Sequence, residues 1–267
     1  VAQNTAPTFV NGARQGMSVC ANIAPRSINS LLTVTDPDVG QTQIWSVIAG
    51  PLHGTLGGFN TADTATGAPV SPSGLTYQPT TGYSGLDSFS VIVSDSFAFD
   101  TTTIVVTVNP SPTLSSTRTP ASICDGAFFN YTPTSATGGV TFTWSRSFTG
   151  GISTPTSTGT GSISEVLNNS TNYTVPVTYV YNLTAGGCAG PAANVVVNVH
   201  PTPRLSSKLN DTICGGATFT YVPTTPTSGT TFSWSRAAVG GISPATSAGT
   251  GNINEVLTNS ASGPVSV

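Results

Sequence analysis

The chain has 267 residues, a formal net charge of −3 and only 6% charged residues, while hydrophobic residues make up 37%. With a single lysine, Lys208, and no basic patch, the sequence argues against nucleic acid as a partner. No apolar run approaches the roughly 20 residues of a membrane span, so we expect no membrane insertion within this segment. Because apolar residues alternate with polar ones, the composition favours folded β modules over disorder.

Residues 1–109 are predicted to form one all-β module. The segment from Ile44 to Ile48 is expected to be a buried strand around Trp45. Two later runs, DSFSVIV (87–93) and TTIVVTV (102–108), place an apolar residue at every second position. This period is that of strands with one buried face, and the buried residues are expected to be Phe89, Val91, Val93, Ile104, Val106 and Val108.

The rest of the chain contains a tandem repeat. Residues 124–177 recur as residues 214–267 at an offset of 90, and 31 of the 54 aligned positions are identical. The second copy stops within a repeat unit, so we expect the 267 residues to belong to a longer protein. The proline-containing segments NPSP (109–112) and HPTP (200–203) are predicted to be linkers between modules. The predicted modules are therefore residues 1–109, 110–200 and 201–267.

The second module carries the clearest strand patterns. From residue 173 to 183 every second residue is apolar, with mostly Thr and Asn between, and residues 195–199 repeat the pattern with Val. Several short alternating strands within about 90 residues, Gly and Pro turns and a central Trp144 are typical of an immunoglobulin-like sandwich. The predicted fold is all-β, with tandem immunoglobulin-like β-sandwiches in an extended repeat array.

Two charged residues recur at the same spacing in both copies. Arg146 and Glu165 are 19 residues apart, as are Arg236 and Glu255. By alternation Arg146 follows Trp144 on the inner face, and Glu165 also points inward. An unpaired buried charge is costly, so we expect each arginine to bind its glutamate as a structural ion pair.

No catalytic residues are assigned. Glu165 and Glu255 are the only glutamates, so neither module holds a glutamate pair, and no Ser or Cys lies in a nucleophile elbow. His53 and His200 are isolated and are expected to lie in loops. We therefore expect no enzymatic activity within these residues. The exposed candidates Phe97 and Phe99 either form a sugar platform or pack at a module end.

Specific motifs resemble known families. Residues 19–109 contain TVTDPDVGQTQIWSV, GPLHGTL, LTYQPTTGYSGLDSFSVIVSD and TTTIVVTV, and they resemble bacterial Ig-like or cadherin-like repeats. Residues 113–267 contain SIC, FxYxPT, TFTWSR, GTGSISEVLNNS and TYVYNLTAGGC, and they resemble the PKD-like repeats of very large surface proteins. The resemblance implies export by type IX secretion and kinship with gliding and attachment adhesins.

The resemblance to cadherin-like repeats suggests calcium as the one candidate cofactor. Calcium prefers six to eight oxygen ligands, and Asp-rich turns supply them in cadherin-like modules. TDPDVG (35–40) is such a turn, and the candidate ligands are Asp36, Asp38, Asp87 and Asp95. The competing interpretation is a turn in which the Asp side chains bind local backbone.

The four cysteines have no metal-finger spacing, and a surface protein meets oxidising conditions, so disulfides are expected. Cys124 and Cys188 are the only cysteines of the second module, which favours a bond between them. The alternative is Cys188 with Cys214. We expect Cys214 to be unpaired and Cys20 to be a buried free thiol.

Thr64, Thr101 and Thr212 lie in DTA, DTT and DTI, which resemble an Asp-Thr-apolar motif for O-glycosylation in the same group of bacteria. Chance matches in a Thr-rich chain are the competing explanation.

Two functions fit the sequence. In the first, the segment is a non-enzymatic stalk of a large secreted cell-surface adhesin or filament, and its partners are the neighbouring repeats. In the second, the modules are carbohydrate-binding or spacer modules of a secreted polysaccharide-degrading enzyme. Surface glycans or other cell-surface proteins are further candidate partners, and the chain is expected to be secreted or at a bacterial cell surface.

Overall fold

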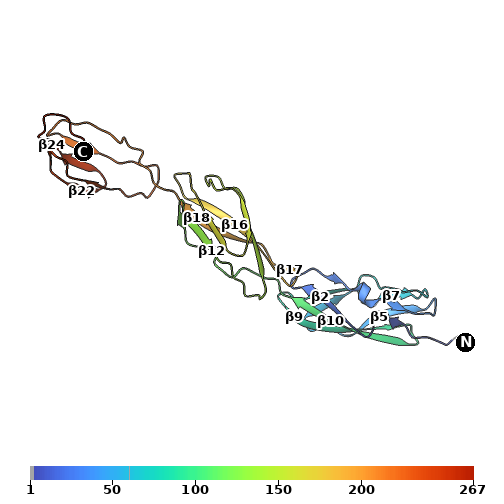
Figure 1. Ribbon diagram of the computed structural model, residues 1–267. Coiled ribbons are helices and arrows are strands. Elements are labelled where there is room, and N and C mark those ends of the chain that lie inside the picture. Colours follow the sequence, from blue (N-terminus) through green and yellow to red (C-terminus); the bar gives the residue numbers. More distant parts are fainter. Residues whose placement is uncertain (1–2, 60) are drawn as a thin grey trace. The chain divides into compact units, whose positions relative to one another are not determined.

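The computed structural model describes residues 3–59 and 61–267, which form β-strands, turns and one short 3-10 helix (Figure 1). The 3-10 helix η1 spans Asn29–Leu32. Within these described residues, no helix is long and apolar enough to cross a membrane. The fold is all-β and consists of immunoglobulin-like β-sandwich modules in tandem, as the sequence predicts.

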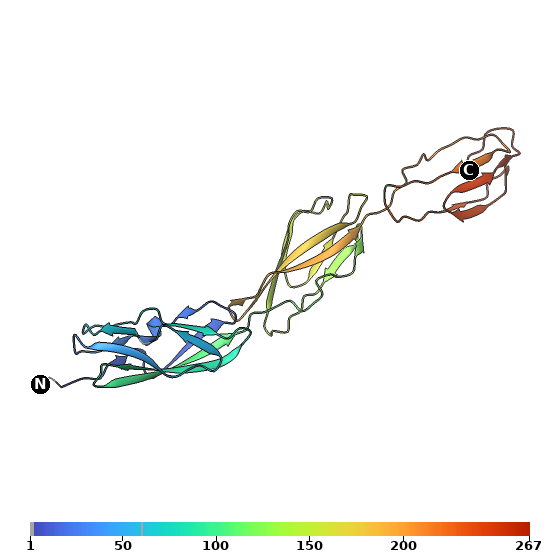
Figure 2. The same cartoon turned by 180° about the vertical axis from the view of Figure 1, so that it is seen from behind.

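The first module pairs a five-stranded sheet with a three-stranded one (Figure 2). The larger sheet has the order β2-β10-β9-β5-β7, the smaller β3-β8-β6, and β1 pairs with β4. Strand β10 is parallel to β2 and antiparallel to β9. The bounds are β1 Thr8–Phe9, β2 Arg14–Cys20, β3 Arg26–Ser27, β4 Val34–Thr35, β5 Thr42–Ala49, β6 Gly54–Gly57, β7 Thr61–Thr64, β8 Thr76–Pro79, β9 Gly85–Ser94 and β10 Phe99–Asn109.

The core of this module is built by the alternating patterns seen in the sequence. Strands β9 and β10 bury every second side chain, and their buried residues are Phe89, Val91, Val93, Ile104, Val106 and Val108. Trp45 of β5 is fully buried, and its indole Nε1 donates to the Leu32 carbonyl at 2.9 Å. Ile44 and Ile48, at the ends of the segment that was predicted to be buried, are exposed, and of these three residues only Trp45 is buried.

The second module has the sheet order β11-β18-β16-β13-β14, with β17 attached to β16, and a separate pair β12-β15. Its bounds are β11 Ile123–Cys124, β12 Phe128–Tyr131, β13 Thr141–Arg146, β14 Ser157–Thr160, β15 Ile163–Val166, β16 Val175–Ala185, β17 Cys188–Ala189 and β18 Ala193–His200. Strand β16 buries alternate side chains from Val175 to Leu183, including Tyr179 and Tyr181. Tyr173, which the pattern also placed inside, precedes the strand and is 61% exposed.

The third module repeats the second with shorter strands, in the pairs β19-β23, β20-β22 and β21-β24. Their bounds are β19 Thr218–Tyr221, β20 Ser233–Arg236, β21 Ile242–Ser243, β22 Ser247–Thr250, β23 Ile253–Val256 and β24 Thr258–Asn259. Pairs β12-β15 and β19-β23 have the same register at the offset of 90: Phe129 faces Glu165, and Phe219 faces Glu255. The repeat in the sequence is therefore a repeat in strand pairing.

Two compact units divide the chain, and the division cuts through the second module. The first comprises residues 1–116, 133–143 and 181–193, and the second residues 117–132, 144–180 and 194–267. The first unit thus includes the turn that joins β16 to β17. The three modules with limits at residues 109 and 200 stay a prediction.

The disulfide joins Cys20 to Cys188, with the two Cα atoms 5.6 Å apart. The predicted Cys124–Cys188 bond is therefore wrong, and so is the predicted free thiol at Cys20. Cys124 and Cys214 are free and exposed. The alternative bond from Cys188 to Cys214 is not formed either.

The length of one strand explains why Cys124 cannot reach Cys188. Cys124 pairs with His200 at the end of β18, whereas Cys188 precedes the start of that strand. At about 3.3 Å per residue, the eight residues of β18 separate the two ends by roughly 23 Å. Two cysteines can be bridged only when their Cα atoms lie within about 7 Å of each other.

A tight hairpin brings Cys188 to Cys20 within the first unit. Gly186 and Gly187 have φ values of +56° and +80°, as a two-residue turn between paired strands requires, and Ala185 pairs with Cys188. Cys20 ends β2 opposite Asn109 of β10. The chain after the hairpin lies against Pro112: a Cβ on Gly190 would clash with the Pro112 carbonyl oxygen, so this approach needs glycine.

Candidate functional site

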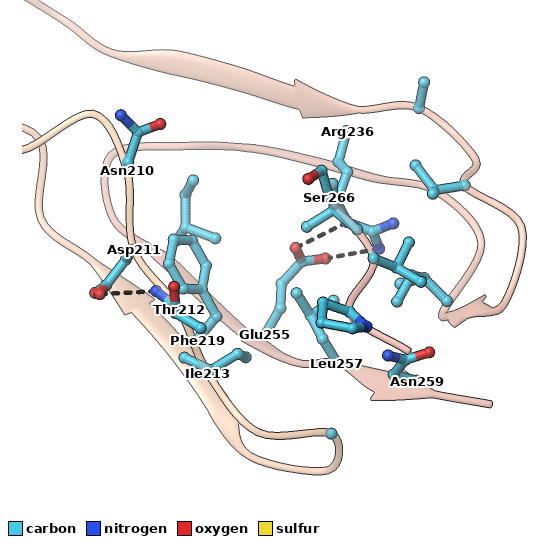
Figure 3. A pocket seen from close by; sticks show the side chains of 18 of the residues that line it. Asn210, Asp211, Thr212, Ile213, Phe219, Arg236, Glu255, Leu257, Asn259 and Ser266 are labelled. Atoms are coloured by element: carbon cyan, nitrogen blue, oxygen red, sulfur yellow. Dashed lines mark hydrogen bonds and ion pairs between the residues drawn. The ribbon is translucent and has the colours of Figure 1, made fainter. Parts of the chain in front are cut away.

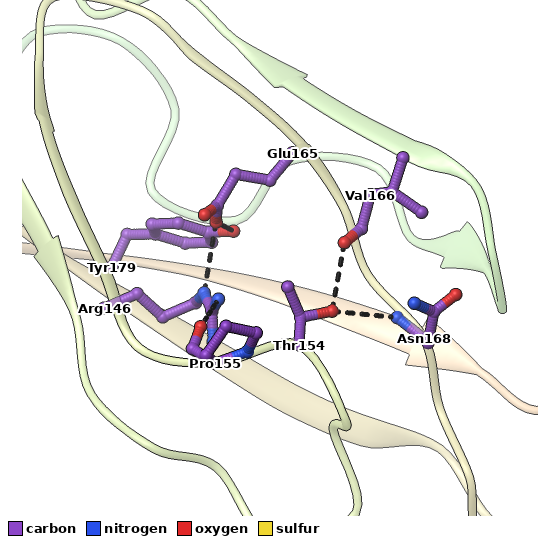
Figure 4. A network of polar contacts seen from close by, with 7 residues as sticks. All are labelled: Arg146, Thr154, Pro155, Glu165, Val166, Asn168 and Tyr179. Carbon is purple, nitrogen blue, oxygen red and sulfur yellow. Dashed lines mark hydrogen bonds and ion pairs between the residues drawn. The ribbon is translucent and has the colours of Figure 1, made fainter.

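The most enclosed polar group in the second module is the ion pair between Arg146 and Glu165 (Figure 4). Strand β13 carries Arg146 two residues after the buried Trp144, so alternation directs its side chain inward. Strand β15 places Glu165 opposite, and Arg146 Nε lies 3.1 Å from Glu165 Oε2. The Arg146 side chain is fully buried and that of Glu165 is 14% exposed. The structure thus forms the pair that the spacing of 19 residues predicts.

Two further groups complete this network. Tyr179 of β16 donates its hydroxyl to Glu165 Oε2, and its ring lies beneath the Arg146 guanidinium, 5.9 Å from ring centroid to Cζ. Arg146 Nη2 donates to the Pro155 carbonyl, while Nη1 has no partner among the described atoms. The sequence indicated that Tyr179 points inward, but nothing in it identified the carboxylate that the hydroxyl binds.

The surroundings of Glu165 and Tyr179 set the pKa values of both side chains. Burial alone would raise the pKa of Glu165. The hydrogen bonds from Ser157, Tyr179 and Arg146 lower the pKa by more than burial raises it, so the pKa of Glu165 lies below its usual value. Burial, followed by the nearby Glu165, raises the pKa of Tyr179 well above its usual range. Glu165 is therefore charged and Tyr179 neutral at physiological pH. A single carboxylate occupied by two donors is suited to holding β13, β15 and β16 together.

The third module repeats the ion pair beside an open cavity (Figure 3). Arg236 Nε lies 3.2 Å from Glu255 Oε2, and Arg236 Nη2 lies 3.4 Å from Oε1. The hydrogen bond from Arg236 is the main cause of the lowered pKa of Glu255. A cavity of about 670 Å³ surrounds the pair, and its apolar lining includes Phe219, Trp234, Ile253 and Leu257.

The four aspartates proposed as calcium ligands do not form one group, although the Gln41 side-chain amide lies 3.3 Å from Asp36 Oδ2 and 3.2 Å from Asp95 Oδ2. Asp36 accepts from the Asp38 amide and from Gln43 Nε2, and Asp38 accepts from the Thr5 amide. Asp95 accepts from the Phe97 and Ala98 amides and from Asn4, which keep its pKa low although burial opposes them.

Asp87 lies elsewhere. It binds the Leu52 and His53 amides and the Tyr77 hydroxyl, so the four-ligand site is wrong. In the part of the chain that the structure describes, no three His, Cys, Asp or Glu side chains form a group that could hold a metal ion. Asp36 and Asp95 accept from backbone amides two or three residues away, which is the competing interpretation, whereas Asp38 and Asp87 accept from amides 33 to 35 residues away.

The three Asp-Thr motifs share one local geometry. In each, the aspartate Oδ1 accepts from the backbone amide of the following threonine, at 2.8 Å for Thr64, 2.7 Å for Thr101 and 2.9 Å for Thr212. All three threonines are exposed. The motifs are therefore accessible to a modifying enzyme.

Both histidines have structural partners. His53 stacks on the Tyr83 ring with centroids 3.9 Å apart, and His200 Nδ1 lies 2.8 Å from the Thr174 hydroxyl. By contrast, Phe97 is 78% and Phe99 63% exposed, so they do not pack at the module end.

Comparison with known proteins identifies the kind of module. A family model described as PKD-like domain matches residues 121–203. Residues 121–203 are therefore similar to PKD-like domains, which are typical of extracellular spacer or adhesion proteins. The third module shares this sequence pattern through the repeat. No curated protein matches the chain.

Solved structures match this chain at low identity and low TM-score. The extracellular cadherin domains 1–4 of protocadherin Gamma B7 are 12% identical with a TM-score of 0.37, over 95% of this chain and 68% of that chain. The IG1+IG2 pair of DIP-gamma is 11% identical with a TM-score of 0.33, over 74% and 98%. The endo-fucoidan hydrolase MfFcnA4 from glycoside hydrolase family 107 is 19% identical with a TM-score of 0.31, and the match covers 74% of this chain but only 29% of the hydrolase.

Proposed function

We propose that these residues form a non-enzymatic stalk of a large secreted adhesin or filament, which holds a distal binding region away from the cell surface. The observation that carries the proposal is the recurrence, at an offset of 90 residues, of one β module built around the same ion pair. A repeated module with a conserved interior lengthens a protein without adding a new site.

The disulfide supports a position outside the cell. Cys20–Cys188 is of the kind that forms and persists in oxidising compartments. Export by type IX secretion and a role in gliding or attachment belong to this proposal through the resemblance of the PKD-like repeats. The exposed threonines of the Asp-Thr motifs are candidate O-glycosylation sites in the same setting.

A second function is favoured by one observation, the exposed pair Phe97 and Phe99 in the first module. Aromatic rings that face solvent can stack on sugar rings. In this case the modules bind glycans as part of a secreted polysaccharide-degrading enzyme. Retention of the purified chain on immobilised polysaccharide, lost on Phe97→Ala with Phe99→Ala, would favour this function over the stalk.

The stalk proposal is tested by replacing residues 110–200 in the full-length surface protein. Deleting residues 110–200 should reduce attachment of cells, and inserting an unrelated β-sandwich of similar length should restore it. Surface display of each variant, measured with an antibody, controls for export. If the displayed replacement fails to restore attachment, the module has a binding role of its own and the stalk proposal fails.

A further inference from the structure

Cys20 and Cys124 occupy the same structural position in two successive modules. Each ends a strand that runs parallel to the last strand of its module. Cys20 ends β2 opposite Asn109 of β10, and Cys124 ends β11 opposite His200 of β18. In both modules the amide that follows the cysteine donates to the carbonyl of that opposite residue at 2.8 Å. The two cysteines are therefore structural equivalents.

The two linkers that follow these positions are also equivalent. They read NPSPTLSS and HPTPRLSS, with the prolines and the LSS sequence at the same spacing. The Ser115 amide donates to the Thr134 carbonyl at 2.8 Å, and their hydroxyl oxygens lie 2.9 Å apart. Ser206 binds Thr224 in the same way and at the same distances. The chain thus enters the second and the third module through one set of contacts.

The first of the two cysteines shows which partner belongs to this position. Cys20 is bonded to Cys188, which follows the Gly186–Gly187 turn of the next module. Cys124 is free and exposed in the described part of the chain. In an oxidising compartment disulfides form and persist, and an unpaired exposed cysteine there indicates a bond to a further cysteine or a reactive thiol.

The repeat gives the place of the equivalent partner for Cys124. The cysteine after the double-glycine turn belongs to the repeat unit that begins at Cys124 and recurs at an offset of 90. This offset carries Cys188 to position 278, which lies beyond Val267, the last residue given. The offset holds without a gap over the 54 aligned positions, so the turn is expected to recur at the same distance.

We propose that Cys124 forms a disulfide with a cysteine at about position 278, in the hairpin of the third module, so that each joint between successive modules is closed by one disulfide. The bond joins the two sulfur atoms. The two thiols lose two protons and two electrons to a disulfide of the oxidising compartment, which is reduced to two thiols. Linker and disulfide then form two covalent connections at each joint, which restrict its bending. By the same rule Cys214 binds the hairpin cysteine of a fourth module.

The first experiment maps the disulfides of the full-length secreted protein. The protein is alkylated without reduction, digested and analysed by mass spectrometry. The expected result is a disulfide-linked pair of peptides, one with Cys124 and the other from the region of position 278. Alkylated Cys124, or Cys124 bonded to Cys214 or to a second chain, would overturn the proposal.

The second experiment completes the third module with residues of the second. A copy of residues 178–200 appended after Val267 supplies the rest of β16, β17 and β18, and it places the copy of Cys188 at position 278. The fused chain is exported to a bacterial periplasm, where disulfides form. Titration in denaturant without reductant should find one free thiol, Cys214, whereas the unfused chain has two. Three free thiols in the fused chain would overturn the proposal.

Serine variants of the fused chain identify the bonded pair. Cys124→Ser should present two free thiols, because Cys214 and the appended cysteine lie at opposite ends of one module and cannot be bridged. The matched variant Cys214→Ser should present none. The reverse result, none for Cys124→Ser and two for Cys214→Ser, would show that the bond forms within the third module, and the proposal would fail. If the fused chain is not exported, the peptide map of the full-length protein decides.

Discussion

At the scale of single residues, the second module depends on one buried charge, that of Arg146, whose Nε binds Glu165 while its Nη1 has no partner among the described atoms. Arg146 is a fully buried side chain in a chain with few charges, and Glu165 and Tyr179 reach it from two other strands. The spacing and alternation in the sequence were sufficient to predict the pair. They could not predict the tyrosine contact, because a strand pattern shows which face a side chain occupies but not which strand lies opposite.

Removing the carboxylate should destabilise the second module. In Glu165→Gln the fully buried Arg146 loses its counter-charge, and we expect a loss of about 3–5 kcal/mol in the free energy of unfolding. The matched variant Glu255→Gln should cost less, because the Arg236 side chain is 10% exposed whereas that of Arg146 is fully buried. Urea denaturation of both variants checks this, and equal losses would contradict it.

The same carboxylate should make stability depend on pH. The folded-state pKa of Glu165 lies below its usual 4.5, so the folded state releases the proton more readily than the unfolded chain. Its contribution is therefore present above pH 4.5 and is lost as the pH falls through the folded pKa. The stability difference between wild type and Glu165→Gln, measured by denaturation from about pH 6 to about pH 3, should shrink toward acid. A difference that stays constant would be inconsistent with this origin.

At the scale of elements, strand patterns were predictable and the end of a sheet at which each cysteine lies was not. The alternation in residues 87–93, 102–108 and 175–183 corresponds to β9, β10 and β16. The disulfide depends instead on the Gly186–Gly187 turn, which reverses the chain before Cys188, and on the length of β18. The prediction paired Cys124 with Cys188 because both lie in the second module, and it took no account of the turn or of the length of β18.

The Cys20–Cys188 bond should stabilise the first unit. It closes a loop between residues 168 positions apart, for which the chain-entropy model gives about 5 kcal/mol, and measured losses for native disulfides are about 2–5 kcal/mol. Cys20→Ser should therefore lower the free energy of unfolding by about 2–5 kcal/mol. Cys124→Ser, at an exposed free thiol, is the control and should have little effect.

Thiol titration checks the pairing independently of stability. The native, unreduced chain should present two reactive thiols, and Cys124→Ser should present one. In denaturant, Cys20→Ser should present three, because Cys188 is released from the disulfide and its buried thiol becomes accessible. Peptide mapping that found Cys124 bonded to Cys188 would contradict the structure.

At the scale of the whole molecule, two near-copies of one module differ in how completely their cores are enclosed. The apolar and charged residues of the interior are the same, so the sequence predicts two modules of one kind. Strands β16 and β18 cover the second core, and their repeat equivalents would begin at residues 265 and 283, at or beyond the last residue given, Val267. In a chain that ends at Val267, the second copy should therefore be more stable than the third.

Limited proteolysis with trypsin should reveal this difference at one matched pair of bonds. Arg146 in β13 and Arg236 in β20 are repeat equivalents, and each forms an ion pair with a glutamate. The residue after each arginine is small and uncharged. Strand β13 has neighbours on both sides and β20 on one, so local opening around Arg236 costs less free energy and cleavage there should be faster. Mass spectrometry over a time course should detect the fragment ending at Arg236 well before the fragment ending at Arg146. Cleavage of the denatured chain provides the control for intrinsic rates, and equal native rates at the two sites would show that the third module is closed as firmly as the second.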